Sequence, residues 1–200
     1  MTDAAGASRE SRDAVIRALL PMVPERGWTR GTIAAAMRAL ELPPEEATFL
    51  FPRGVISAVE AWTDLADREM AAAAGDLTGL RIPDRIRTLV AIRLRQAAPH
   101  KEALRQAMAV LALPWNTPVA LRGAARTASA MWHAAGDTSA DFSWYTRRAS
   151  LAAIYSATLA YWLRDASEDI GPAMDFLDRR LEGLARIGRC RRRIASMRAA

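Results

Sequence analysis

Residues that build cross-links and metal sites are scarce in this sequence. Cys190 is the only cysteine among 200 residues, so neither an internal disulfide nor a multi-cysteine zinc site can form. The two histidines, His100 and His133, are far apart in sequence and neither belongs to a Glu-x-x-His motif, which gives a metal site little support. No paired nucleophile and base, phosphate-binding loop or carboxylate cluster is found. The sequence therefore predicts no metal, no cofactor and no catalysis.

Long apolar runs are also missing. The longest uncharged run, 149–163, contains Ser150, Ser156 and Thr158 and is shorter than the ~20 apolar residues of a membrane-spanning helix. This run predicts a buried helix instead. Residues 1–10 are small and polar and carry no apolar segment of a secretory signal, so we expect no such signal.

Residues with high β-propensity are few, and the remaining pattern is helical. Hydrophobic residues make up 51% of the chain and are largely alanine, leucine, isoleucine and methionine. Apolar positions recur three or four residues apart, and proline or glycine separates the segments. We expect an all-α protein with helices near 9–20, 29–40, 44–51, 55–74, 83–98, 100–113, 117–135 and 144–165, and one that opens within 168–172. In the helix near 83–98, four arginines are expected to face away from the apolar positions: Arg85, Arg87, Arg93 and Arg95.

Three short helices followed by five or six longer ones resemble the order of a TetR-like protein, in which a helix-turn-helix precedes a ligand-holding bundle. We therefore expect a TetR-like helical bundle with an N-terminal helix-turn-helix-like three-helix segment. The expected division is a disordered N-terminus at 1–8, a helix-turn-helix-like subdomain at 9–52, a bundle at 53–187 and a basic tail at 188–200. This likeness of order carries no function by itself.

The segment 44–51 argues against DNA binding. A helix-turn-helix places this third helix in the major groove, where side chains must donate to phosphates and base edges. The segment reads Pro-Glu-Glu-Ala-Thr-Phe-Leu-Phe, without Arg, Lys, Asn or Gln, and phosphates would repel Glu45 and Glu46. We therefore expect no nucleic-acid partner. The alternative hypothesis is that the protein is a TetR-type, ligand-responsive transcription regulator.

Two adjacent aromatic residues open the helix expected at 144–165. Asp141 or Ser143 can cap this helix, but capping does not explain Trp144 and Tyr145. A first helical turn cannot bury both rings on one face, so at least one is expected to be exposed. An exposed aromatic residue next to two arginines has the composition of an interface hot spot. The alternative is that Trp144 packs on the end of the preceding helix.

Small side chains are common among the helices from 55 to 165. They either allow a close-packed, alanine-rich core or leave room for a long apolar ligand. If the small side chains leave room for a ligand, methionines and aromatic residues would form the wall of its binding site, because methionine adapts its shape to a ligand. The expected lipid-binding residues are Trp62, Met70, Met108, Met131, Tyr155, Leu159 and Trp162.

The C-terminal tail is strongly basic and contributes to the net charge of +6. Ile187, Cys190, Ile194 and Met197 fall on one helical stripe with arginines around it, which is typical of a helix lying on an anionic membrane. A solvated, partly disordered basic end is the alternative. The expected membrane contacts are Ile187, Arg191, Ile194 and Met197.

Three sequence motifs carry a resemblance to a known family. The segment 136–148 reads Gly-Asp-Thr-Ser-Ala-Asp-Phe-Ser-Trp-Tyr-Thr-Arg-Arg, and it is preceded by Pro-Glu-Arg-Gly-Trp-Thr at 24–29 and Phe-Pro-Arg-Gly at 51–54. Over about 12–187 the chain resembles the ubiquinone-biosynthesis accessory family of the coenzyme Q9 type. The Asp-x-x-Trp-Tyr-x-x-Arg segment is the most specific of the three.

The resemblance implies a function as well as a TetR-like fold. Members of this family are not repressors; they dimerise, associate peripherally with the membrane and bind lipids, including isoprenoid quinone intermediates. They assist the di-iron hydroxylase that acts on demethoxyubiquinone. We therefore expect a non-catalytic accessory protein, a homodimer that is cytoplasmic and peripheral on the inner membrane, with an isoprenoid quinone or phospholipid as ligand. The expected interface with the hydroxylase consists of Asp141, Trp144, Tyr145 and Arg148.

Overall fold

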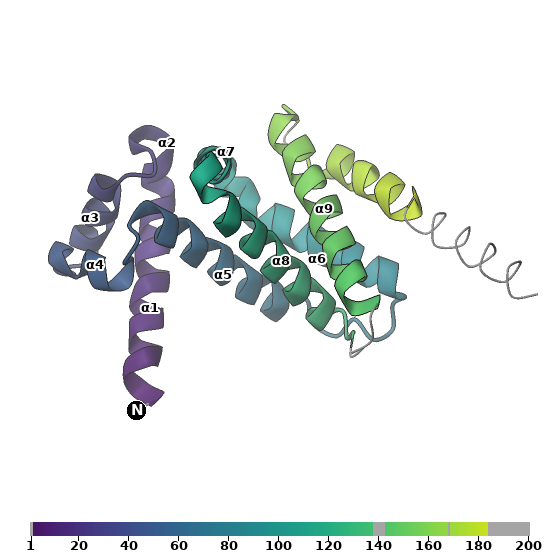
Figure 1. The fold of residues 1–200 in the computed structure, drawn as a ribbon, viewed down its shortest axis with the longest axis horizontal. Coiled ribbons are helices and arrows are strands. Elements are labelled where there is room, and N and C mark those ends of the chain that lie inside the picture. Colours follow the sequence, from purple (N-terminus) through teal and green to yellow (C-terminus); the bar gives the residue numbers. More distant parts are fainter. Residues whose placement is uncertain (1, 138–142, 168, 184–200) are drawn as a thin grey trace, which may run out of the picture.

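The protein is an assembly of helices. The computed structural model describes residues 2–137, 143–167 and 169–183, and every regular element within these ranges is helical (Figure 1). The prediction of an all-α fold is confirmed. In chain order the elements are α1 (Thr2–Leu19), η1 (Leu20–Met22), α2 (Val23–Arg26), α3 (Arg30–Ala39), η2 (Pro44–Glu46), α4 (Ala47–Leu50), α5 (Val55–Ala73), α6 (Ile82–Ala97), η3 (Ala98–His100), α7 (Lys101–Leu111), η4 (Pro114–Asn116), α8 (Thr117–Ala134), α9 (Ser143–Arg164) and a helix at 171–183.

The first helix begins earlier than the sequence pattern indicated. α1 starts at Thr2, whereas the sequence predicted a helix from about residue 9 and a disordered end before it. The predicted start of this helix near residue 9 is therefore wrong. Alanine is the best helix former, and three alanines fall within residues 2–8, so this stretch continues the helix without apolar periodicity.

The stops and starts of the next helices follow from local chemistry. After α1 the chain turns through η1 and α2, and Gly27, with φ of +70°, ends that turn. Thr29 caps α3, because its hydroxyl oxygen accepts a hydrogen bond from the backbone N–H of Thr32 at 3.0 Å. Figure 1 shows α3 and α4 beside α1, in the expected three-helix arrangement.

A first hydrophobic core joins this three-helix segment to the bundle. It contains residues of α1 and α3, such as Ile16 and Met37, together with Trp62 of α5. The rings of Trp28 and Trp62 stack with their centroids 5.6 Å apart, and the Trp28 indole donates a hydrogen bond to the carbonyl oxygen of Ala103 at 2.9 Å. The small segment is therefore anchored on α5 and α7 and shares its core with them.

A second core lies among α5, α6, α8, α9 and the helix at 171–183. α9 packs on α8 with one face only: Leu151, Leu159 and Trp162 are buried, whereas Ala153 and Ala157 are exposed. The uncharged run at 149–163 led us to expect a buried helix. Because one face is uncovered, α9 is peripheral within a single copy.

Candidate functional site

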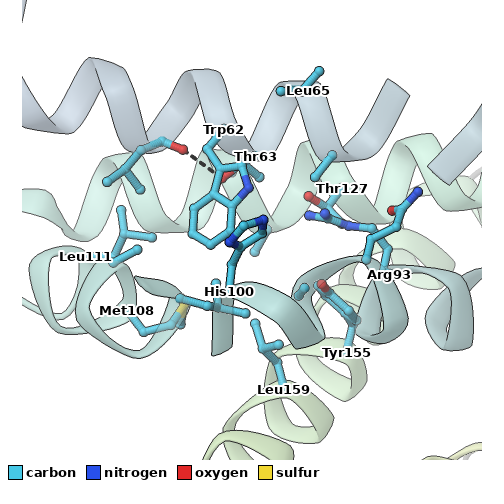
Figure 2. A pocket seen from close by; sticks show the side chains of 18 of the residues that line it. Trp62, Thr63, Leu65, Arg93, His100, Met108, Leu111, Thr127, Tyr155 and Leu159 are labelled. Atoms are coloured by element: carbon cyan, nitrogen blue, oxygen red, sulfur yellow. Dashed lines mark hydrogen bonds between the residues drawn. The ribbon is translucent and has the colours of Figure 1, made fainter. Parts of the chain in front are cut away.

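A cavity of about 560 Å³ lies among α5, α6, α7, α8 and α9 (Figure 2). This volume is within the range of about 300–1,000 Å³ that is common for small-molecule sites. Its walls are mostly apolar, and several of them are alanines, so small side chains leave this space open. The lining includes Trp62, Leu65, Ala66, Ala97, Leu104, Ala107, Met108, Leu111, Ala124 and Leu159, together with the polar Arg93, Gln96, His100, Thr127 and Tyr155.

The two ends of the cavity differ in polarity. Figure 2 shows Met108 and Leu111 at one end, and Arg93, Thr127 and Tyr155 gathered at the other. Leu111 and Met108 come from α7, whereas the polar side chains come from three different helices, α6, α8 and α9. An elongated ligand with one apolar and one polar end matches this distribution.

A buried acidic residue organises the polar end. Asp67 of α5 is 5% exposed, and its Oδ1 lies 3.3 Å from Nη2 of Arg93, which is 9% exposed. The hydroxyl of Thr127 donates a hydrogen bond to Asp67 Oδ2 at 3.0 Å, and Arg126 Nε lies 3.7 Å from the same oxygen. Two arginines and one hydroxyl thus hold a single carboxylate beneath the cavity wall.

Burial shifts the pKa values of three groups at the cavity. Desolvation raises the pKa of Asp67, and the charge of Arg93 and the Thr127 hydrogen bond oppose this shift. Desolvation also raises the pKa of Tyr155, so its phenol is protonated at neutral pH. It lowers the pKa of His100, whose imidazole is therefore neutral at pH 7. His100 and Tyr155 thus present neutral hydrogen-bonding groups to the cavity.

Four of the seven expected lipid-binding residues line this cavity: Trp62, Met108, Tyr155 and Leu159. The other three do not. Met70 and Met131 are fully buried in the second core, and Trp162 is packed there at 1% exposure next to Lys101. Helical spacing identifies apolar positions but not which of them face a void rather than a neighbouring side chain.

The polar residues of the cavity were missed or misplaced by the sequence analysis. Arg93, Gln96 and His100 stand at intervals of three and four residues, the spacing of one helix face. The expectation that Arg93 faces away from the apolar positions is wrong, because its side chain is buried opposite Asp67. This row of polar residues on the apolar face of α6 was the sequence signal that could have indicated the polar lining of the cavity.

The expected partner interface lies at the start of α9. Tyr145 is 70% exposed, which confirms that at least one ring of the aromatic pair is exposed. Arg148 is mostly buried: it bonds Asp137 Oδ2 at 3.3 Å and Ser129 Oγ at 3.4 Å, and so ties α9 to the end of α8. Asp141 and the side chain of Trp144 lie outside the described residues.

The expected membrane contacts in the tail, Ile187, Arg191, Ile194 and Met197, also lie outside the described residues. Within the described ranges, none of the helices combines the length and apolar character that crossing a bilayer requires.

The fold is that of a TetR-like helical protein. A solved structure described as the TetR transcriptional regulator from Nitrosomonas europaea ATCC 19718 has the same fold, with a TM-score of 0.69 and 26% sequence identity over 87% of this chain and 97% of that chain. The fold and the cavity define a helical protein with a partly open, mainly apolar site.

Sequence relatives give the family. The COQ9 family profile matches residues 117–188. The mitochondrial ubiquinone biosynthesis protein COQ9-B of Xenopus laevis is 31% identical over 98% of this chain and 72% of the relative. The mitochondrial COQ9 proteins of rat and human are each 31% identical over 91% of this chain. The chain belongs to the COQ9 family, and it spans 61% of the length of the rat protein and 60% of the human one.

Proposed function

We propose that this protein is a non-catalytic accessory protein of ubiquinone biosynthesis that binds an isoprenoid quinone intermediate in the cavity between α5 and α9. The cavity is the observation that carries the proposal, because its size and its mainly apolar wall match a prenylated ligand. The relatives are named as ubiquinone biosynthesis proteins, which supports a role in this pathway.

The apolar wall supports weak, exchangeable binding. Burying a CH₂ group contributes about 0.8 kcal/mol, so ten carbons of a prenyl tail contribute about 8 kcal/mol. The loss of translational and rotational freedom on association offsets a large part of this gain. A ligand held in this way can be released, which suits a protein that presents lipid to an enzyme.

Presentation to the di-iron demethoxyubiquinone hydroxylase is assigned to the start of α9. Tyr145 is exposed there, and the adjacent Trp144 belongs to the motif that resembles the family's partner interface. The uncovered face of α9, with the exposed Ala153 and Ala157, supports a homodimer, because small residues allow close helix approach. The basic tail would hold the dimer on an anionic membrane surface.

Lipid extraction of the purified protein, followed by mass spectrometry, tests the proposal directly. We expect a prenylated quinone precursor or another isoprenoid lipid in near-stoichiometric amount. Ala124→Phe places a ring in the cavity and should abolish co-purification. Ala125→Phe, at the exposed neighbouring position on α8, is the matched control and should leave the lipid in place. Recovery of an empty protein under native conditions would overturn the proposal.

Transcription regulation is the second candidate, and the likeness to the Nitrosomonas europaea regulator favours it. The charge of the third helix opposes it, because Glu45 and Glu46 are exposed at its start. A gel-shift assay with promoter fragments at moderate salt separates the two functions. Sequence-specific retention would support the regulator.

A further inference from the structure

One aromatic side chain of the three-helix segment is turned to solvent. Phe49 of α4 is 74% exposed, the highest value among the exposed large hydrophobic residues of the described ranges. Its neighbours Leu50 and Phe51 are 6% and 2% exposed, and they fill the inner side of this segment as part of the first core. Packing of the core therefore does not account for Phe49, and exposed aromatic residues are enriched at protein interfaces.

Two glutamates lie beside this ring. η2 runs directly into α4, and Glu45 and Glu46 precede Phe49 by four and three residues, the spacing of neighbouring side chains on one helix face. Both glutamates are exposed, and neither forms an ion pair with any residue in the part of the chain that the structure describes. Arg53, the cation closest to Phe49 along the chain, is paired with Glu60 of α5 instead. A protein with a net charge of +6 thus carries an exposed ring bordered by two uncompensated carboxylates.

We propose that Glu45, Glu46 and Phe49 form a docking surface for an arginine-containing segment of a partner protein. A guanidinium stacks on an aromatic face and also presents a fork of N–H donors that matches a carboxylate, so arginine complements both elements of this surface. The second carboxylate favours a further cation on the same segment. This inference is independent of the ligand in the cavity and adds a binding partner to the proposed function.

The charge of this docking surface disfavours the other macromolecular partners of a three-helix segment. Carboxylates repel the phosphates of a nucleic acid and the head groups of an anionic membrane. In a helix-turn-helix, the third helix is the element that the protein presents to its target. Here the third helix keeps exposed side chains, but its charge is the reverse of what DNA requires, so the complementary target is cationic.

The docking surface also lies apart from the interface assigned to the hydroxylase. Figure 1 shows α4 at one edge of the molecule, whereas α9 begins in the bundle on the other side. One protein can therefore dock at α4 while another is bound at the start of α9. The partner at Glu45, Glu46 and Phe49 is accordingly a protein other than the hydroxylase.

Fluorescence anisotropy of labelled peptides, titrated with the full chain, tests this inference. Two probes carry five arginines or five lysines in the same glycine-serine background, and a third has the sequence of residues 188–200, which also contains five arginines. At about 50 mM salt the arginine probe should bind about threefold more tightly than the lysine probe, because guanidinium stacks on the ring as well as pairing with the carboxylates. Equal binding of these two probes, or no binding, would overturn the inference. Tighter binding of the 188–200 peptide than of the arginine probe would overturn the assignment to another protein and favour the tail of a second copy.

Two variants assign the binding to residues. Phe49→Ala removes the ring and should abolish the preference for arginine over lysine, while both probes still bind. The double variant Glu45→Gln/Glu46→Gln removes both charges and should weaken binding of the arginine probe about fivefold at low salt. An unchanged preference in the first variant, together with unchanged affinity in the second, contradicts the assignment.

Matched controls separate this surface from general effects of charge and of exposed rings. Glu10→Gln/Glu25→Gln makes the same change in net charge at exposed positions of α1 and α2 and should leave the affinity for the arginine probe unchanged. Trp115→Ala removes a ring that is 73% exposed on η4 and should keep the full preference for arginine. Losses in these controls equal to those in the Phe49 and Glu45/Glu46 variants would show that the peptides bind without a specific site and would overturn the inference.

Discussion

The ammonium group of Lys101 lies 4.8 Å from the centre of the Trp162 ring. The same group donates a hydrogen bond to the carbonyl oxygen of Asp165 at 2.8 Å, just beyond the end of α9. Arg105 donates to the carbonyl oxygen of Leu163 at 3.0 Å. The only lysine of the chain thus lies where the dipole of α9 favours a cation, and the first turns of α7 hold the end of α9.

Lys101→Met should therefore destabilise the protein by about 1–3 kcal/mol, because it removes both the cation above Trp162 and the donor to the end of α9. Urea denaturation followed by circular dichroism measures the change. Arg122→Met is the matched control, because it removes a cation at an exposed position on α8. It should change the free energy of unfolding by less than about 0.5 kcal/mol. Equal effects of the two substitutions would show that the Lys101 contacts add nothing.

The buried pair of Asp67 and Arg93 should be strongly coupled. Asp67→Leu leaves the Arg93 charge buried without its partner and should cost about 3–5 kcal/mol. The double variant Asp67→Leu/Arg93→Met removes both charges and should be more stable than the single variant. A double-mutant cycle in urea measures the coupling, and simply additive effects would argue against a buried ion pair.

His100 should make the protein less stable on the acid side of neutrality. Desolvation lowers its folded-state pKa below the usual value of 6.5, so the unfolded state binds the proton first as the pH falls. Stability is therefore lost as the pH falls from about 6.5 through the folded-state pKa. Melting temperatures at pH 7.5 and pH 5.5 should differ less for His100→Gln than for the wild type. The same difference in both proteins would contradict this assignment.

Trp144→Ala and Tyr145→Ala should weaken binding to the hydroxylase at least tenfold, because truncating an aromatic anchor at an interface costs about 2 kcal/mol or more. Surface plasmon resonance with the purified enzyme provides the measurement. Phe49→Ala, which removes a ring 74% exposed on α4, is the control and should leave binding unchanged. A large fall in melting temperature for Trp144→Ala would instead place that ring in the core.

Deletion of the residues after Gly188 should reduce flotation with anionic liposomes, and most clearly at low salt, where electrostatic attraction is least screened. Neutral liposomes provide the comparison, since the arginines gain little there. Unchanged flotation of the truncated protein would exclude the tail as the membrane contact.

The helices and their ends were predictable from the sequence because their causes are local. Proline and glycine stop α1 and α2, the Thr29 hydroxyl caps α3, and apolar spacing marks α5. The same reasoning missed the start of α1, where propensity acts without periodicity. The order of short and long helices, together with the motif at the start of α9, was enough to indicate the fold and the family.

The cavity and its polarity were decided only by the tertiary structure. Met108 and Met131 look alike in sequence, yet one lines the cavity and the other is fully buried in the second core. Arg93 belongs to a row of arginines that the sequence predicted to face away from the apolar positions, and only the approach of α5 brings Asp67 to it. A sequence pattern specifies which side of a helix is buried. Whether that side meets another side chain, a charge or open space depends on how separate helices pack, which no local pattern determines.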